Sequence, residues 1–475
     1  MHLPIPDLII FLLFTAGTVL FGSSFISKNK NAGDYTKGGG KMPGFVVGMS
    51  IFATYVSSIS FLALPGNAYL NNWNALVFSL SIPVASWLAA AYFVPFYRSI
   101  NSASAYSFLE DRFGYWARAY AAVCYLLTQI ARTGSVLFLL ALPVHSMLGW
   151  SIPVIILVAG LAVVVYSVMG GIQAVIWTDA IQGIILIAGA VAVLVIIVLE
   201  LPGGWAQYFD VAAADSKFSL GSFGPALDET TFWVVLLYGI FINLQNYGID
   251  QNYIQRYKSA KDLKSARFSA LFGGLLYIPV SLIFFMIGTG LFVFYQVFPD
   301  LLPVGIEPDK VFPHFIVQQL PVGFTGLLIA AIFAAGMSTM STSINSSATV
   351  ILTDFFRKKL NPKMEMRVLY LASLFIGLAG IGVALAMMSV KSALDAWWNL
   401  AGIFSGGMLG LFLLGYLSKK VKAIPALIGV IAGVMVISWL TFSGQTVFHH
   451  YFTIVLGTIT IFLTGFLLMF FQKKR

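Results

Sequence analysis

Long apolar stretches separated by short polar segments dominate the chain. A helix needs about 20 consecutive apolar residues to cross the hydrocarbon core of a bilayer. Thirteen stretches qualify: residues 5–25, 43–67, 74–98, 116–143, 151–169, 174–199, 231–250, 267–295, 322–354, 367–388, 394–416, 421–441 and 448–470. The pattern predicts an all-α polytopic membrane protein with thirteen transmembrane helices. No Lys or Arg precedes the first stretch, so we expect it to remain as an anchor and not to be removed as a signal peptide.

The composition supports this class. Of the 475 residues, 59% are hydrophobic and 9% are charged, against roughly 25% charged residues in a soluble domain. The single cysteine, Cys124, excludes a disulfide scaffold, and 41 Phe with 20 Tyr exclude a disordered chain. The loops 200–230 and 296–321 are too short to be domains, so residues 1–475 are expected to form a single transmembrane domain.

The net charge of +9 is explained by topology, because Lys and Arg concentrate in cytoplasmic loops. With the N-terminus outside and the C-terminus in the cytoplasm, the inside segments hold Lys28, Lys30, Lys37, Lys41, Arg98, Arg112, Arg118, Arg256, Lys258, Lys261, Lys264, Arg267, Arg357, Lys358, Lys359, Lys363, Arg367, Lys419, Lys420, Lys422, Lys473, Lys474 and Arg475. The exceptions are Lys217, Lys310 and Lys391, with Arg132 inside a span. We therefore expect a multi-pass protein of a bacterial inner membrane, in contact with membrane lipids and not with nucleic acid.

Two charged residues lie well inside predicted spans, where charges are expensive and are usually functional. Arg132 can clamp an anionic substrate, since a guanidinium matches a carboxylate fork to fork. The alternative is a structural arginine bound to backbone carbonyls of a neighbouring helix. Asp179 can be a cation ligand or a proton site, and the alternative is a helix N-cap.

Hydroxyl residues are concentrated between Met337 and Ser347. Ser338, Ser341 and Thr342 are spaced i, i+3, i+4 and share one helix face. Such a face offers uncharged oxygen ligands to a small alkali cation, and its main alternative use is helix packing.

Two spans carry polar residues and helix breakers in or near their middle. The span 43–67 runs through polar residues to Pro65-Gly66, and the span 231–250 holds Asn243, Gln245 and Asn246 before Gly248. Both are expected to be broken helices, which transporters use to bind ions and substrate near the midplane. The two are five spans apart, as expected for two five-helix halves related by an inverted repeat.

No catalytic set is visible in the sequence. The five His residues include no metal-ligand spacing within a span, and Gly38–Gly40 lack the strand and the lysine-serine of a phosphate loop. We therefore expect no enzyme activity, no organic cofactor and no obligatory protein partner.

These features together resemble the sodium:solute symporter family. The motifs are Asp34-Tyr35-Thr36-Lys37 with its following glycines, the segment from Gly170 to Gln182, Gln255-Arg256-Tyr257 and the hydroxyl-rich ninth span. Within the family the chain is most similar to bacterial sialic acid symporters, through Phe52-Ala53-Thr54, Ser57-Ser58-Ile59, Arg132 and the segment 241–245.

The resemblance implies a LeuT-type core of five plus five helices: an extra helix in 1–30, a first repeat in 43–199, a second in 231–416 and two extra helices in 421–475. It implies one sodium site made of the carbonyls of Ala53, Val56 and Ala335 and the hydroxyls of Ser338 and Thr339. It also implies a possible second sodium site at Asp179, Ser338, Ser341 and Thr342. The coupling ion would be Na⁺, one or two per cycle.

For the substrate, the resemblance implies a site formed by Tyr55, Ser57, Ser60, Ser79, Arg132 and Asn243, with Arg132 on a carboxylate. Tyr55 and Ser79 replace a smaller hydroxyl residue and a glutamine, so Tyr55 narrows the pocket and Ser79 shortens a polar arm. The expected activity is import of a carboxylated solute, sialic acid foremost, by sodium symport. The alternatives are a symporter for another sugar, sugar acid, monocarboxylate or amino acid, and an integral-membrane enzyme or sensor.

Overall fold

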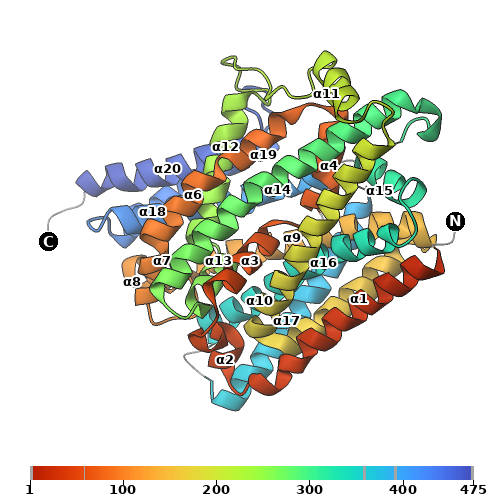
Figure 1. Cartoon of the computed structure of the whole chain (residues 1–475). Coiled ribbons are helices and arrows are strands. Elements are labelled where there is room, and N and C mark those ends of the chain that lie inside the picture. The colour runs from red at the N-terminus through yellow and green to blue at the C-terminus, as the bar shows by residue number, and fades with distance from the viewer. Residues whose placement is uncertain (1–3, 58, 307, 357–359, 390–392, 472–475) are drawn as a thin grey trace.

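The computed structural model describes residues 4–57, 59–306, 308–356, 360–389 and 393–471 as a helical bundle (Figure 1). Within these residues, eleven helices are long and apolar enough to cross a membrane, or twelve if one bent pair counts as a span. The helices are α1 Ile5–Ser23, α2 Ala32–Lys37, α3 Gly44–Tyr55, α4 Leu64–Leu70, α5 Leu76–Leu80, α6 Ile82–Leu88, α7 Val94–Ser99, α8 Ser107–Phe113, α9 Tyr115–Leu148, α10 Ile152–Glu200, α11 Gly204–Ala214, α12 Phe232–Ile249, α13 Gln251–Ser259, α14 Leu263–Val297, α15 Pro308–Gln318, α16 Phe324–Val350, α17 Pro362–Ala386, α18 Ala393–Leu417, α19 Ala423–Phe442 and α20 Phe452–Leu468.

Helix α10 covers two of the predicted spans. Its 49 residues would make a rod of about 73 Å, more than twice the roughly 30 Å hydrocarbon core. Gly171 interrupts it with φ 60° and ψ −174°, a backbone conformation open to glycine. A Cβ atom on residue 171 would lie only 2.7 Å from Oδ1 of Asn29, so a larger residue there would clash with that side chain. The two limbs of α10 thus account for two stretches, while the total of thirteen spans remains a prediction.

The break predicted in the span 43–67 is present. Helices α3 and α4 are bent by 62° relative to each other, and Val56 is extended at φ −77° and ψ 123°. The matching prediction for the span 231–250 is wrong in its position. Helix α12 runs unbroken through Asn243 and Gly248, and the chain leaves the helix only at Asp250, at φ −74° and ψ 128°. A single interior glycine without a proline costs too little to break a helix held by its neighbours.

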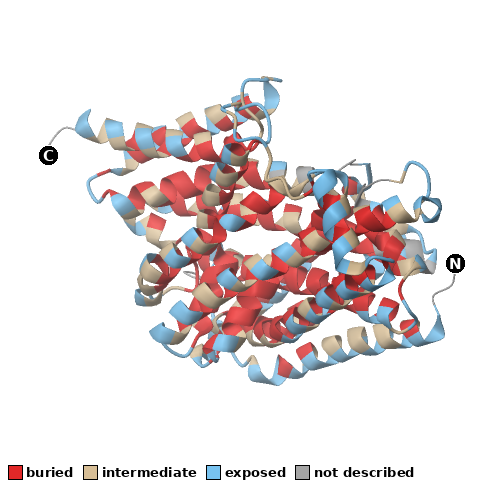
Figure 2. Ribbon diagram, turned by 45° about the horizontal axis from the view of Figure 1, so that its top comes forward, coloured by how far each residue is buried: buried red, intermediate tan, exposed pale blue. Residues whose placement is uncertain are grey.

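Helix α16 is the centre of the bundle, and α1 lies at its edge. In the apolar window of α16, 94% of residues are buried, against 17% for α1. Helix α16 packs against α1, α3, α9, α10 and α17, and Figure 2 shows buried residues filling the middle of the bundle while one edge helix stays exposed. Small Ala, Ser and Thr side chains let neighbouring helices approach α16 from every side.

The basic residues are not all surface charges. Arg256, expected in a cytoplasmic loop, is fully buried, which corrects that assignment. Lys217, an exception to the predicted asymmetry, donates from Nζ to the carbonyls of Tyr69 (2.6 Å) and Asn71 (2.8 Å). It therefore caps the C-terminal end of α4, where a cation is favoured. Seven of the basic residues used to predict the topology lie outside the described residues: Arg357, Lys358, Lys359, Lys391, Lys473, Lys474 and Arg475.

Candidate functional site

A cavity of about 80 Å³ lies beside the break between α3 and α4. It is small beside the roughly 300–1,000 Å³ of typical ligand pockets. Five of the six predicted substrate residues line it: Tyr55, Ser57, Ser60, Ser79 and Arg132. They come from the end of α3, the segment that follows it, α5 and α9, so the break brings backbone and side-chain polar groups to one place.

Arg132 enters this cavity from α9. Its Nη2 donates to the carbonyl oxygen of Thr54 at 2.6 Å, in the last turn of α3. In the described residues no carboxylate lies within ion-pair distance of Arg132. This contact is of the kind expected for a structural arginine bound to a backbone carbonyl. It uses one of the five N–H donors of the guanidinium. The guanidinium forms no ion pair in the described residues, and its positive charge can attract an anion in the cavity.

Tyr55 places an aromatic ring in the wall of the cavity. Its ring packs on three other tyrosines, Tyr247, Tyr253 and Tyr277, at centroid distances of 5.8, 6.4 and 4.5 Å. Its hydroxyl donates to Oδ1 of Asn243. Asn243 is therefore not a lining residue as predicted; it lies behind Tyr55 and donates to Ser81 Oγ at 2.8 Å. Asn243 thus contacts a residue that lines the cavity, the Tyr55 hydroxyl, and is not itself among the lining residues.

Several polar residues of the cavity were not assigned to the substrate site from the sequence. Gln129, Gln245 and Asp250 line it together with the predicted set. Asp250 is almost fully buried and accepts hydrogen bonds from the Asn252 backbone (2.8 Å) and from Gln129 Nε2 (3.4 Å). The only signal in the sequence was its place at the end of the polar span 231–250. A buried carboxylate thus shares the cavity with Arg132.

The residues of the first predicted sodium site are all buried between α3 and α16. Ala53 and Val56 flank the end of α3, where helix carbonyls lose their intrahelical partners. Ala335, Ser338 and Thr339 lie on α16, and the Thr339 hydroxyl donates to the Ala335 carbonyl at 3.1 Å. Uncharged oxygens at the end of a broken helix suit a small hard cation.

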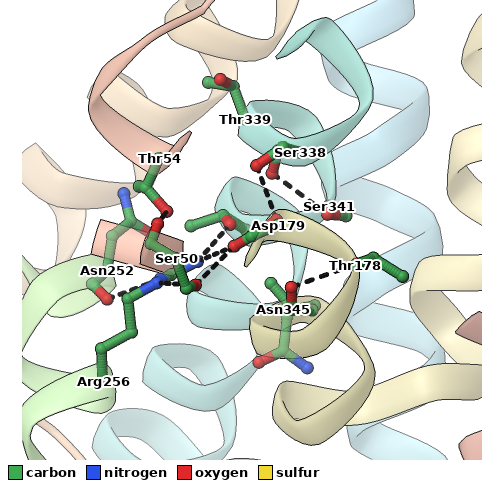
Figure 3. A network of polar contacts seen from close by, with 12 residues as sticks. Ser50, Thr54, Thr178, Asp179, Asn252, Arg256, Ser338, Thr339, Ser341 and Asn345 are labelled. Atoms are coloured by element: carbon green, nitrogen blue, oxygen red, sulfur yellow. Dashed lines mark hydrogen bonds and ion pairs between the residues drawn. The ribbon is translucent and has the colours of Figure 1, made fainter. Parts of the chain in front are cut away.

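Figure 3 shows Asp179, Ser338 and Ser341 of the possible second sodium site in one network of polar contacts. The fourth residue, Thr342, joins this network through a hydrogen bond from Arg256. Asp179 Oδ1 accepts from Ser338 Oγ at 2.6 Å. The Ser341 hydroxyl donates to the Ser338 carbonyl at 3.1 Å. Asp179 lies eight residues past Gly171, inside α10. Within the described residues its carboxylate bonds only to side chains of other elements, so the N-cap interpretation is wrong.

The same network contains a cation that sequence reasoning missed. Arg256 of α13 donates from Nη2 to Asp179 Oδ2 at 2.6 Å and to Thr342 Oγ1 at 2.7 Å. Ser50 bridges the pair, donating to Asp179 Oδ2 and accepting from Arg256 Nε, both at 2.7 Å. The Asp179–Arg256 pair is fully buried. Both carboxylate oxygens of Asp179, and Nε, Nη1 and Nη2 of Arg256, form hydrogen bonds. A sodium ion at Asp179 would therefore share the carboxylate with Arg256 or displace it.

Two further hydroxyls of α16 hold neighbouring helices. Ser343 donates to Gln129 Oε1 and Ser346 to Gln255 Oε1, both at 2.8 Å. Gln255 in turn donates to Asn345 Oδ1 at 3.0 Å. The packing interpretation therefore applies to Ser343 and Ser346, which hold α9 and α13 against α16. Ser338 contacts Asp179 instead, and the ion-binding interpretation of that part stays a prediction.

The fold and the site define a polytopic transporter with a broken helix beside a central polar cavity. The sequence model of the sodium:solute symporter family matches residues 35–433. The chain belongs to the sodium:solute symporter family.

Its relatives and structural neighbours agree. The chain is 33% identical over 460 residues to the sodium/sialic acid symporter SiaT of Proteus mirabilis, covering 95% of this chain and 92% of the relative. It is 33% identical over 456 residues to the sodium/sialic acid symporter NanT of Aliivibrio fischeri, covering 94% and 89%. A solved substrate-bound, outward-open Na⁺-coupled sialic acid symporter superposes with a TM-score of 0.93 at 30% identity, covering 99% of this chain and 98% of that chain. The predicted family and the all-α LeuT-type fold are confirmed, and the class is that of transporters.

Proposed function

We propose that this protein imports a carboxylated solute together with sodium, and that sialic acid (N-acetylneuraminate) is the solute. The observation that carries the proposal is Arg132, whose guanidinium faces a central cavity without a carboxylate partner in the described residues. The relatives named above are described as sodium/sialic acid symporters. In this assignment Arg132 holds the carboxylate, and Ser57, Ser60 and Ser79 bind hydroxyl or amide groups.

The sodium sites and the halves of the fold are part of the same proposal. The first ion binds the carbonyls of Ala53, Val56 and Ala335 and the hydroxyls of Ser338 and Thr339. The second binds at Asp179, Ser338, Ser341 and Thr342. Residues 43–199 and 231–416 are the two inverted repeats, flanked by 1–30 and 421–475, with the N-terminus outside and the C-terminus in the cytoplasm of a bacterial inner membrane.

Transport then follows alternating access. Sodium at the first site joins the broken end of α3 to α16 and shapes the cavity next to Arg132. Substrate binds beside it, the outer side closes, and the inner side opens. The ions drive this cycle only because they bind one conformation better than the other. A sodium ion shared with Asp179 would loosen Arg256 on α13, which would couple the second ion to movement of that helix.

The energetics favour two ions for a scarce anion. Each sodium crossing ~100 mV contributes roughly 2.3 kcal/mol, and a roughly tenfold gradient adds about 1.4 kcal/mol. Two ions supply roughly 7 kcal/mol, and one imported anion returns about 2.3 kcal/mol. The remainder supports accumulation of up to about 10⁴-fold, whereas one sodium per anion supports about tenfold.

A smaller zwitterion, such as an amino acid, is the second candidate. Tyr55 fills part of the cavity, and Asp250 adds a carboxylate that could accept an ammonium group. Uptake of labelled N-acetylneuraminate into proteoliposomes tests the two, with an inward sodium gradient or with potassium in its place. Sodium-dependent uptake that excess amino acid does not inhibit supports sialic acid.

The Tyr55→Ser variant sharpens this experiment. It removes the ring that narrows the cavity, so a bulky sugar acid should bind more tightly and a small zwitterion less tightly. No uptake of N-acetylneuraminate by folded wild type or by Tyr55→Ser would contradict the sialic acid assignment. Sodium-dependent uptake of an amino acid by the wild type would then favour the second candidate.

A further inference from the structure

A second cavity, of about 230 Å³, lies at the end of α7 and shares no lining residue with the central one. Three basic side chains from three elements line it: Lys37 of α2, Arg98 of α7 and Lys258 of α13. The rest of the lining is the segment from Tyr97 to Asn101, and none of the lining residues is acidic. Three cations around one hollow, without a carboxylate in its wall, make an environment suited to an anion.

Lys258 and Arg98 each have N–H donors beyond those used in their hydrogen bonds to the backbone. Lys258 Nζ donates to the carbonyls of Ile100 (2.9 Å) and Ser102 (2.5 Å), which uses two of its three N–H groups. Arg98 donates from Nη1 alone, to the carbonyls of Tyr257 (2.8 Å) and Ala260 (2.9 Å). In the described residues, Nε and Nη2 of Arg98 have no recorded acceptor. The backbone contacts hold both side chains in place and leave donors for a further ligand.

The three cations of this cavity repel one another, and no acidic residue lines the cavity. Burial, together with the charges of Lys37 and Arg98, lowers the pKa of Lys258 to about 7. The acid that acts on Arg98 is Asp262, an exposed residue that caps α14 through Ser265 and does not line the cavity. A bound anion would offset the mutual repulsion of the three cations and would favour the protonated lysine.

The position of the cavity indicates where the anion comes from. The apolar span Trp73–Ser99 ends at this cavity, so its mouth lies at the level where hydrocarbon gives way to headgroups. The exposed rings of Phe45 and Phe268 lie near the same end, close to where Gly44 of α3 packs against Ser265 of α14. Basic pockets at the cytoplasmic ends of spans are suited to anionic headgroups.

We propose that Lys37, Arg98 and Lys258 form a binding site for a phosphate-bearing anion, occupied in the membrane by the headgroup of an anionic phospholipid. The occupant joins α2, α7 and α13, of which α13 packs against both α2 and α7 (Figure 1). Helix α13 also carries Arg256, two residues before Lys258, so the lipid steadies the helix that binds Asp179. This inference does not depend on which solute is transported.

Binding of phosphatidylglycerol to the purified full chain in detergent tests the proposal, with phosphatidylcholine as the neutral-headgroup comparison and native mass spectrometry as the readout. Phosphatidylglycerol should bind at least tenfold more tightly than phosphatidylcholine. Lys258→Gln and Lys37→Gln should each weaken its binding by about tenfold. Lys261→Gln removes the same charge from an exposed position outside the cavity and should leave binding within twofold.

Two further arms make the result decisive. Binding at pH 6 should exceed binding at pH 8 by up to about tenfold, because Lys258 passes from mostly protonated to mostly neutral. Lys258→Arg should bind at both pH values and lose this dependence. If Lys258→Gln does not fold, as judged by gel filtration, Lys37→Gln and Lys258→Arg carry the test.

The source of the anion is separated with inorganic phosphate. Preference for phosphatidylglycerol, displaced by millimolar phosphate in the wild type, supports the lipid headgroup. Stabilisation by phosphate alone, lost in Lys37→Gln and without lipid preference, supports a soluble phosphate at the same site. Equal binding of both lipids with no effect of phosphate, or equal losses in Lys261→Gln and Lys37→Gln, would overturn the proposal.

Discussion

Asp179 binds three partners through two carboxylate oxygens, and one of these partners is a fully buried arginine. Taking such a pair out of water is costly, so its hydrogen bonds to Ser50, Ser338 and Thr342 are needed to offset the desolvation. Removal of one member leaves the other charge buried and unpaired. At the residue scale, Asp179 therefore combines a structural contact with the proposed ion site.

The Asp179→Asn variant separates these two roles. Loss of the carboxylate should lower the sodium Hill coefficient of uptake toward one, because the second ion loses its only charged ligand. It should also lower thermal stability, since breaking a buried pair costs about 3–5 kcal/mol. Arg256→Gln is the matched control: it should cost similar stability but keep the carboxylate for sodium. An unchanged Hill coefficient in Asp179→Asn would remove this site from the mechanism.

Arg132→Ala should abolish uptake of an anionic solute supplied near the wild-type apparent affinity, while the protein stays folded. A hydrogen bond to a charged group is worth about 1.5–3 kcal/mol, so loss of the clamp weakens apparent affinity by roughly 10–100-fold. Arg132→Lys keeps the charge without the planar fork and should fall between the two. Substrate-dependent uptake rates in proteoliposomes measure this, and wild-type uptake by Arg132→Ala would rule out the clamp.

At the element scale, two charged side chains hold helix ends that lack local caps. Asp7 of α1 is fully buried, and its Oδ1 accepts from the backbone N–H groups of Gly323 (2.7 Å) and Gly326 (2.6 Å) at the start of α16. A carboxylate is favoured at a helix N-terminus. Lys217 does the converse at the C-terminal end of α4. The edge helix α1 is thereby tied to the central helix.

Asp7→Ala should destabilise the protein, because it leaves two N–H groups of α16 without their acceptor. The expected loss is about 0.5–2 kcal/mol, as for other helix caps. Asp7→Asn keeps an amide oxygen at the same place and should retain most of the stability. Thermal unfolding in detergent measures both variants. A similar loss in Asp7→Asn would assign the effect to the charge and not to the cap.

At the scale of the whole molecule, the two ion sites and the anion determine the charge that moves in each cycle. Two sodium ions with one anion carry one net positive charge inward, so a negative-inside potential should accelerate uptake. One sodium with one anion would be electroneutral. Potassium-diffusion potentials imposed on proteoliposomes distinguish these cases. A rate independent of potential in the wild type would reduce the stoichiometry to one.

The sequence by itself was enough for the class of fold and for much of the site. Apolar length predicts membrane helices locally, and Arg132 and Asp179 stand out because charges are rare in apolar spans. It was not enough for contacts between distant segments. The residues around Arg256 in the sequence do not distinguish an exposed loop arginine from a buried one. Arg256 is buried because α13 packs against α3 and α16.

The tertiary structure decided what each polar residue contacts. Asn243 lies behind Tyr55, Asp250 joins the cavity, and Asp7 and Lys217 cap helices that are distant in sequence. Hydropathy depends on each residue and its neighbours along the chain, so a membrane span can be read from one segment. A binding site depends on how several helices pack, and that arrangement is set by long-range contacts that no single segment contains.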